Sequence, residues 1–269
     1  MKREKICFIG GGNMGEAIIR GLIDKKLCEK ENIWLYEIDK AKQEKFSRIG
    51  VNIAKTPTDG ISESDFVLLA LKPGVIRGFL TENKESLQGK VIISIAASVP
   101  ISLICEVLGE GTPAIRIMPN TPMLVGKGAS AISANDNVTK KDFQYICRLF
   151  SGISLVSVLE EENMNRVISV NGSSPAYVYA FIRGMLNGAI EQGIDEKQAL
   201  PLILRTIEGA VKMVEKSDVS IDTLIERVCS PGGTTLEAMK VFSEKDFEKI
   251  IAEAMTACTN RADEITETL

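Results

Sequence analysis

The chain has 269 residues, 45% of them hydrophobic and 25% charged, which is typical of globular proteins and excludes disordered and fibrous classes. The net charge of −4 gives no basic excess for nucleic acid or an anionic membrane. No apolar run approaches the ~20 residues of a membrane-spanning helix, and the amino-terminal residues lack the hydrophobic stretch of a signal peptide. We therefore expect a soluble, cytoplasmic protein that binds neither nucleic acid nor membrane.

The usage of cysteine and histidine limits the chemistry. The 6 cysteines are widely scattered without a CxxC pair, which predicts free thiols and no metal site. Histidine is absent, so Ser/His/Asp and Cys/His machinery and every histidine-containing zinc site are excluded. Any chemistry must therefore use hydroxyls, carboxylates, amides, lysine, water or a cofactor.

Short β-rich apolar runs alternate with amphipathic helical segments over residues 1–160. Runs of this kind, bounded by Gly, Pro, Asn or charged residues, are typical of strands buried on both faces of a parallel sheet. The pattern predicts an α/β domain with a doubly wound sheet of the Rossmann type. The expected strands are Ile6–Ile9, Ile33–Glu37, Phe66–Leu71, Val91–Ala96, Ala114–Met118, Ala129–Ile132 and Ser154–Val158, and the expected helices include Glu16–Lys26, Lys40–Ile49, Ile101–Leu108 and Lys140–Phe150.

The pattern changes after Glu160, where strand-like runs disappear and apolar residues recur at three- and four-residue spacings. We expect a helix that begins near Glu160 and joins an all-helical second domain over residues 161–269. Gly193 and Asp195 are expected to end one helix and cap the next. The predicted helices are Tyr177–Gln192, Gln198–Lys216, Ile221–Val228, Thr234–Val241 and Phe247–Leu269.

A glycine-rich motif follows the first expected strand and precedes the first expected helix. Gly10, Gly12 and Gly15 fit GxGxxG, in which the glycines permit a tight turn, approach of a pyrophosphate and close helix–strand packing. The alternative is a plain glycine turn, but the position after the first strand favours dinucleotide binding. Asn13 and Met14 lie within the same motif and are expected to contact the cofactor.

Glu37 ends the second expected strand, twenty-two positions after Gly15. An acid at this distance grips the adenosine ribose hydroxyls of NAD in dinucleotide-binding folds. The alternative interpretation is a solvated acid at the end of a strand, and the neighbouring Asp39 complicates the assignment.

Three further loops follow strands, where ligands bind in open α/β sheets. Ala70, Leu71, Lys72 and Pro73 form one of them, and Ala96 and Ala97 lie in the next. In the third, two prolines flank Asn120 and Thr121, which suggests a rigid mount for an amide near the nicotinamide. The alternative is that these prolines only end a strand.

Two motifs stand out in the helical part. Residues 171–177, NGSSPAY, interrupt a helical pattern with small hydroxyl residues and a proline, and a kink with a serine cap is the simplest interpretation. Residues 229–235, CSPGGTT, place a Gly-Gly turn before a helix, which leaves backbone N–H groups free to bind a carboxylate. The two threonine hydroxyls at this turn can cap the helix or donate to a substrate.

Taken together, IGGGNMGEAI, LKPG, SIAA, RIMPNTP, GSSPAY and CSPGGTT, in this order and spacing, resemble the pyrroline-5-carboxylate reductases. The resemblance runs nearly end to end, and GSSPAY with SPGGTT is far more specific than GxGxxG. It implies hydride transfer from NADH or NADPH to the C=N carbon of 1-pyrroline-5-carboxylate, the last step to proline. It also implies a helical substrate-binding and dimerisation domain, with dimers that often assemble into larger rings.

The resemblance implies roles for individual residues. The backbone N–H groups of Gly232, Gly233 and Thr234 would hold the ring carboxylate, and Thr235 would hydrogen-bond the ring nitrogen and deliver a proton, directly or through water. Further substrate contacts are expected from Ser174, Ser230 and an acid before GSSPAY, which is Glu161 here, the middle one of three adjacent acids.

The chain departs from the family after the second strand. Many relatives carry small hydroxyl residues there, suited to a 2′-phosphate, whereas this chain has Glu37-Ile38-Asp39, which favours NADH over NADPH.

Two other hypotheses about the function stay open. A 3-hydroxyacid dehydrogenase of similar build would need a catalytic lysine motif, which Lys197, Lys212 and Lys216 lack. A nicotinamide-binding protein without catalysis would bind the cofactor but show no turnover.

Overall fold

The computed structural model describes residues 4–269, which form two compact units. The first unit contains the described residues up to Pro175 together with Ala257–Leu269, and the second is Ala176–Thr256. The segment 161–175 thus packs with the sheet. The boundary expected after residue 160, between a dinucleotide-binding domain and a substrate-binding and dimerisation domain, stays a prediction.

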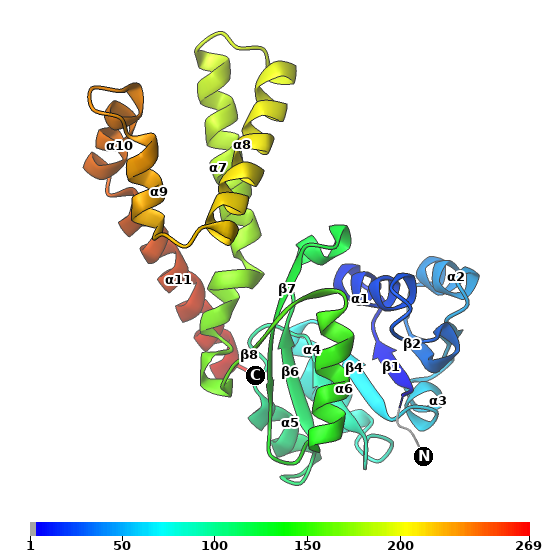
Figure 1. Ribbon diagram of the computed structural model, residues 1–269. Coiled ribbons are helices and arrows are strands. Elements are labelled where there is room, and N and C mark those ends of the chain that lie inside the picture. Colours follow the sequence, from blue (N-terminus) through cyan, green and yellow to red (C-terminus); the bar gives the residue numbers. More distant parts are fainter. Residues whose placement is uncertain (1–3) are drawn as a thin grey trace. The chain divides into compact units, whose positions relative to one another are not determined.

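The first unit is built on an eight-stranded sheet with the order β3-β2-β1-β4-β5-β6-β7-β8 (Figure 1). All neighbouring strands are parallel except β6 and β7, which are antiparallel. The order reverses between β1 and β4, which is the switch point where open α/β sheets bind ligands. The strands are β1 (Ile6–Ile9), β2 (Ile33–Tyr36), β3 (Asn52–Ile53), β4 (Phe66–Leu69), β5 (Val91–Ser94), β6 (Ala114–Met118), β7 (Gly128–Ala134) and β8 (Ser154–Val158).

Two apolar layers cover the sheet. Successive residues of β1 point to opposite faces, so Phe8 packs into one layer and Ile9 into the other. Helices α1 (Asn13–Asp24), α2 (Lys40–Arg48) and α6 (Lys140–Ser151) contribute to the layer of Phe8, and α3 (Pro57–Ser62), α4 (Pro73–Glu82) and α5 (Ile101–Leu108) to that of Ile9. The predicted Rossmann-type sheet is confirmed.

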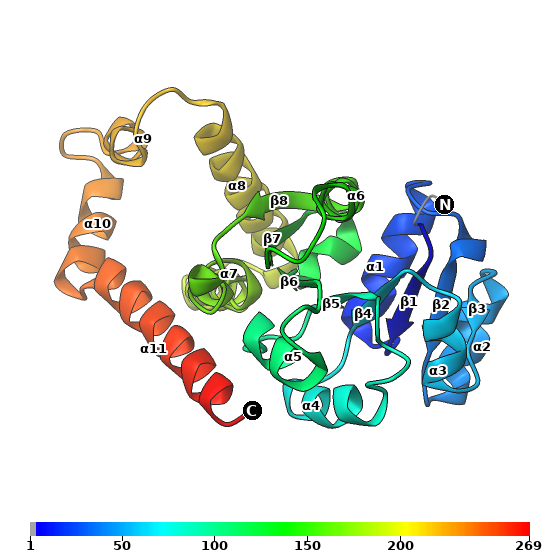
Figure 2. The same ribbon diagram turned by 90° about the horizontal axis from the view of Figure 1, so that it is seen from below.

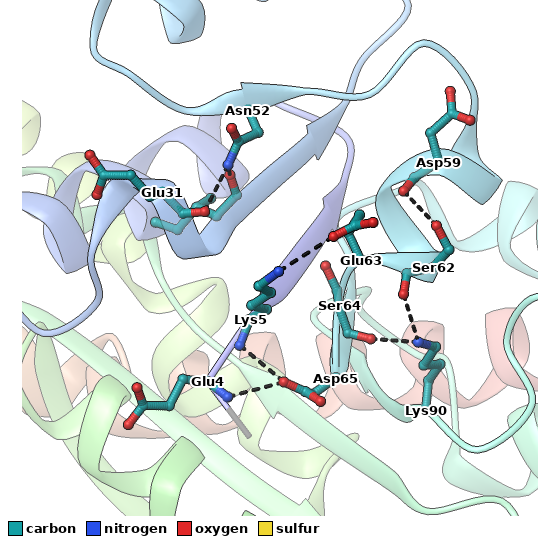
Figure 3. A network of polar contacts seen from close by, with 11 residues as sticks. Glu4, Lys5, Glu31, Asn52, Asp59, Ser62, Glu63, Ser64, Asp65 and Lys90 are labelled. Atoms are coloured by element: carbon teal, nitrogen blue, oxygen red, sulfur yellow. Dashed lines mark hydrogen bonds and ion pairs between the residues drawn. The ribbon is translucent and has the colours of Figure 1, made fainter. Parts of the chain in front are cut away.

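Polar contacts tie together the amino-terminal ends of β1, β4 and β5 (Figure 3). The predicted cofactor loops follow the opposite, carboxyl ends of these strands. Asp65, before β4, accepts the backbone N–H groups of Glu4 and Lys5, before β1, at 3.1 and 3.2 Å. Lys90, before β5, donates to the carbonyl of Ser64 at 2.6 Å. These contacts fix the register of the three central strands and leave their carboxyl ends for a ligand.

The predicted elements differ from the structure mainly at their ends. The three strands β2, β4 and β5 stop one or two residues early, because the chain turns into loops there. Two helices, α3 and α4, and the short strand β3 were not predicted. Instead of a helix from Glu160, the structure has a single 3-10 turn (Glu161–Asn163) and a π turn (Ile168–Gly172).

The second unit is entirely helical (Figure 2). Gly193 has φ +86° after α7, and the carboxylate of Asp195 caps α8 by accepting the Lys197 N–H, as expected. Within 176–256 only Ala199 and Ile203 are buried, so this unit has almost no core of its own. Its helices are α8 (Glu196–Lys216), α9 (Ile221–Val228), α10 (Thr234–Glu244) and most of α7 (Ser174–Glu191) and α11 (Phe247–Glu267).

Among the described residues, no helix combines the length and apolar character that crossing a membrane would need.

Candidate functional site: a dinucleotide cradle and an uncapped helix terminus

The glycine-rich turn lies at the switch point of the sheet. Gly10 has φ +102°, and a Cβ there would lie 2.7 Å from the carbonyl oxygen of Ala70. Gly15 packs against the same turn, because its Cβ would lie 2.5 Å from the carbonyl oxygen of Gly10. Both positions therefore require glycine for steric reasons.

The first turn of α1 has free backbone donors. Gly12 is its N-cap and offers no side-chain cap, and a Cβ on Gly12 would have nothing within 4 Å. Asn13, the first helical residue, is exposed, and Met14 packs against the apolar layer below. Space, free N–H groups and the positive end of a 12-residue helix together fit a pyrophosphate.

Glu37 is almost fully buried, at 7% exposure, and its carboxylate contacts the glycine-rich turn. Oε2 accepts the N–H of Gly11 at 2.7 Å, and Oε1 accepts the N–H groups of Ile38 and Asp39 at 2.9 and 3.0 Å. Lys42 lies 3.9 Å from Oε2. The carboxylate therefore joins β2, the glycine-rich turn and the start of α2, in addition to any contact with a ribose.

The other two predicted cofactor loops lie beside the glycine-rich turn. Because β4 lies parallel beside β1 and β5 lies parallel beside β4, Ala70 and Ala96 follow strands that end at the same edge of the sheet. Lys72 is the N-cap of α4 without a side-chain cap, and Pro73 is its first residue, a position where proline needs no N–H partner. The half-buried Leu71 and Ala97 complete these loops.

Asn120 lies in the loop between β6 and β7 and is 8% exposed. Its Nδ2 donates to the carbonyl of Asn171 at 3.1 Å, and its Oδ1 accepts the N–H of Ala129 at 2.8 Å. Asn171 in turn donates to the carbonyls of Met118 and Ala129. The Asn120 amide thus holds the loop to the π turn, and its contact with a nicotinamide stays a prediction.

The CSPGGTT motif forms a tight turn that opens α10. Gly232 has φ +69°, and the N–H of Gly233 donates to the carbonyl of Ser230 at 2.9 Å. Gly233 is the N-cap of α10 and makes no side-chain cap bond, so the N–H groups of Thr234 and Thr235 begin an 11-residue helix without a cap. This arrangement fits a carboxylate, as the sequence suggested.

Two residues expected to contact substrate have other partners in the first unit. Glu161 Oε1 lies 3.0 Å from Nη1 of Arg116 and also accepts the N–H of Ile101, while its Oε2 is buried without a partner. The hydroxyl of Ser174 donates to the carbonyl of Val170. Their substrate contacts stay predictions.

Sequence reasoning passed over Arg116 and Asn171. Arg116 lies on β6 with a side chain that is only 4% exposed. An arginine inside an apolar strand was the available signal, because a buried guanidinium needs an anionic or carbonyl partner. Asn171 gave a weaker signal, because in the sequence it is only one polar residue in a motif of small residues.

Among the described residues no cluster of acids or cysteines fits a metal ion.

The sheet, its glycine-rich turn at the switch point and the helical part that follows define a two-domain, Rossmann-type NAD(P)H-dependent oxidoreductase. The chain is 35% identical over 266 residues to the pyrroline-5-carboxylate reductase of Escherichia coli K12, covering 98% of this chain and 99% of that protein. The chain is also 32% identical to the pyrroline-5-carboxylate reductase of Methanosarcina acetivorans, covering 98% of this chain and 99% of that protein. The chain belongs to the pyrroline-5-carboxylate reductase family, which confirms the resemblance.

Domain and structural comparisons agree. Residues 161–265 match the family described as pyrroline-5-carboxylate reductase dimerisation, and residues 5–98 match NADP oxidoreductase, coenzyme F420-dependent. The pyrroline carboxylate reductase of Plasmodium falciparum, solved with NADP bound, is similar with a TM-score of 0.90 and 28% identity over 99% of both chains. That of Coxiella burnetii has a TM-score of 0.90 and 31% identity, covering 98% of this chain and 99% of that one.

Proposed function

We propose that this protein reduces the C=N bond of 1-pyrroline-5-carboxylate to give L-proline, the last step of proline biosynthesis. One observation carries the proposal: a pyrophosphate cradle at the switch point and an uncapped Gly-Gly helix terminus occur in one chain of this family. The first suits a dinucleotide and the second a small carboxylate. A chain without histidine suits this reaction, because a protonated imine is already electrophilic and needs mainly positioning.

The cofactor is a nicotinamide dinucleotide, which supplies the hydride when it is bound. The N–H groups at the start of α1 would hold its pyrophosphate, with Gly10, Gly12 and Gly15 giving the room. The two loops after β4 and β5 would line the same site, as would Asn120. These residues orient the cofactor and contribute no proton.

We also propose that NADH is preferred over NADPH. The carboxylate of Glu37 lies directly beside the glycine-rich turn and is held there by the N–H of Gly11. A 2′-phosphate near it would bring about two negative charges next to a buried anion. Lys42 would favour NADPH instead, because its ammonium lies 3.9 Å from the Glu37 carboxylate and can bind a phosphate as a point charge.

The substrate would bind at the start of α10. The N–H groups of Gly232 and Thr234 would hold the ring carboxylate, with Ser230 at the turn beside them. The N–H of Gly233 donates to the carbonyl of Ser230 at 2.9 Å and would have to leave that bond to join them. The hydroxyl of Thr235 would donate to the ring nitrogen and supply the proton that makes the imine cationic, directly or through water, and solvent water would then return a proton to the hydroxyl. Holding the ring in one orientation accounts for most of the catalytic effect in this proposal.

Self-association is part of the proposed function. The second unit buries only two residues and exposes large apolar side chains, including Leu202 at 68% and Met213 at 58%. Such helices need a partner to cover them, and a second copy is the simplest one in a family with a dimerisation domain. We propose a dimer, with a larger ring as its further assembly.

A cytoplasmic location is also proposed. All six cysteines are free thiols in the structure, which is the state expected in a reducing compartment.

The deciding experiment is oxidation of NADH or NADPH by the purified full-length protein with 1-pyrroline-5-carboxylate. A panel of 3-hydroxyacids, run in the oxidative direction, tests the dehydrogenase alternative. Turnover with the imine and none with the hydroxyacids is expected. Cofactor binding without turnover on any substrate would instead support the non-catalytic alternative.

A further inference from the structure

Buried Arg116 is paired with side chains from the segment that follows β8. Its Nη1 lies 3.0 Å from Oε1 of Glu161, and its Nη2 donates to Oδ1 of Asn165 at 2.6 Å. The Arg116 side chain is 4% exposed, so these contacts replace water around the guanidinium. The position of the segment 161–165 is therefore tied to the middle of the sheet.

The same two side chains extend the network in two directions. Oε1 of Glu161 accepts the N–H of Ile101, the first residue of α5, at 3.1 Å. Nδ2 of Asn165 donates to Oδ1 of Asp263 at 2.7 Å and to the hydroxyl oxygen of Thr266 at 3.0 Å. Both of these acceptors belong to α11, 98 and 101 positions later in the chain.

Thr266 completes a path back to the loop after β5. Its hydroxyl donates to the carbonyl of Ser98 at 2.8 Å and lies 3.0 Å from that of Ala262. The chain end is fixed beside it, since the carbonyl of Leu269 accepts Nε of Arg77 at 2.5 Å. The loop from Ser98 to Ile101 is thus held at one carbonyl and one N–H by side chains from outside it.

The loop needs external support. Ser98 has φ +64°, a left-handed conformation that a residue with a Cβ rarely adopts and that persists only when its surroundings hold it. The preceding residues Ala96 and Ala97 carry only methyl groups, so they offer no side-chain hydrogen bonds of their own. The N–H of Ala96 donates to the hydroxyl of Ser94 at 3.3 Å, and the rest of the loop is held by the contacts at Ser98 and Ile101.

We propose that Arg116, Glu161, Asn165 and Thr266 are positioning residues that set the conformation of the cofactor loop 96–98. This inference rests on the proposed function in one respect, namely that this loop contacts the dinucleotide. It gives Glu161 a role other than binding substrate. It also places the support in segment 161–165, before the chain leaves the first unit at Pro175, and in segment 257–269, after the chain has returned to that unit.

The test compares Thr266→Val with Thr268→Val in the full-length protein. The first variant keeps the shape of the side chain and removes the hydroxyl that donates to Ser98. The second is a matched control, because Thr268 lies directly after α11 and its hydroxyl donates to a nearby residue of the same segment, to the carbonyl of Ile265 at 2.9 Å. Thr266→Ser restores the hydroxyl and should restore the wild-type behaviour.

Dissociation constants for NADH and NADPH, measured by nucleotide fluorescence, are the main readout, because they do not require turnover. We expect Thr266→Val to weaken both nucleotides about fivefold, the effect of about 1 kcal/mol. The KM for the imine and the kcat at saturating cofactor should stay within about twofold. Hydrogen exchange should become faster in peptides covering residues 96–101.

Unchanged nucleotide affinity in a folded Thr266→Val protein would overturn the proposal. So would an equal loss in Thr268→Val, or a failure of Thr266→Ser to recover. If the wild-type protein itself bound neither nucleotide, the proposed function would be wrong, and this outcome is distinct from a loss confined to Thr266→Val.

Discussion

The carboxylate of Glu37 lies 2.7 Å from the backbone nitrogen of Gly11 and so joins the end of β2 to the glycine-rich turn. A side chain at Gly11 would not fit, because its Cβ would lie 2.9 Å from the ring of Phe46 and 3.2 Å from Glu37. The acid therefore shapes the turn and places a negative charge beside it. Both effects bear on cofactor choice.

Replacing Glu37 with Ser should change cofactor selectivity. We expect the ratio of kcat/KM for NADPH to that for NADH to rise about tenfold, an effect of about 1.4 kcal/mol, because a buried anion near the ribose is lost. Both nucleotides should also bind more weakly, since the N–H groups of Gly11 and Ile38 lose their acceptor. Steady-state kinetics with both nucleotides measures the ratio. Glu44→Ser, at an exposed position on the neighbouring helix α2, should leave this ratio unchanged. Preference of the wild-type enzyme for NADPH would refute the assignment of Glu37.

Gly10→Ala should abolish tight nucleotide binding. The new methyl group would meet the carbonyl oxygen of Ala70 at 2.7 Å, in a backbone with φ +102°. We expect the dissociation constant to rise at least about tenfold. Gly78→Ala is the control, because it lies within α4 with nothing within 4 Å of its added methyl. Equal affinity in Gly10→Ala and wild type would show that the turn does not approach the cofactor.

Thr235→Val should lower kcat by at least about tenfold and leave nucleotide affinity nearly unchanged. In the proposed mechanism the hydroxyl acts on the ring nitrogen in the transition state, whereas the variant keeps the backbone N–H groups of the turn. Thr206→Val removes an exposed hydroxyl that donates only to the carbonyl of Leu202 in its own helix, and it should behave like wild type. Full activity of the Thr235 variant would remove this residue from the mechanism.

The full-length protein should be a dimer at micromolar concentration. The physical reason is the second unit, where Ala199 and Ile203 are the only buried residues of 176–256. Light scattering coupled to gel filtration gives the mass directly. A stable and active monomer would contradict the prediction, and a mass several times that of the dimer would support the proposed ring.

Stability should fall in alkaline solution because of Cys7. Burial raises the pKa of its thiol from 9.0 to about 12, against an opposing effect of Lys90. Between these two values the unfolded chain loses a proton that the folded chain keeps, so the free energy of unfolding decreases as pH rises. The decrease for one thiol is about 1.4 kcal/mol per pH unit above 9.

Urea unfolding of wild type and Cys7→Ala at pH 7.5 and pH 10 tests this effect. The cavity created by the substitution costs the same at both pH values, so the difference between them isolates the thiol. On going to pH 10, the free energy of unfolding of the variant should fall by about 1.4 kcal/mol less than that of wild type. An equal loss in both proteins would show that the Cys7 thiol ionises in the folded state as it does in the unfolded one.

Local patterns in the sequence were enough for the nucleotide cradle. The apolar run of β1, the spacing of Gly10, Gly12 and Gly15 and the helix that follows are contiguous, so steric rules for glycine and the period of the helix define them without distant contacts. The Gly-Gly turn before α10 was predicted for the same reason. The parallel sheet followed from the alternation of strands and helices.

Only the tertiary structure decided which side chains meet over long distances in the chain. Glu161 reads as one of three adjacent acids, and its partner Arg116 lies 45 positions earlier. Asn120 reads as an amide presented to a ligand, yet its hydrogen bonds go to Ala129 and to Asn171. Thr266 has no local motif at all. Such contacts depend on how β6, the segment after β8 and the end of α11 pack around one buried charge, and a buried charge selects its partners by three-dimensional proximity, which no local pattern in the sequence records.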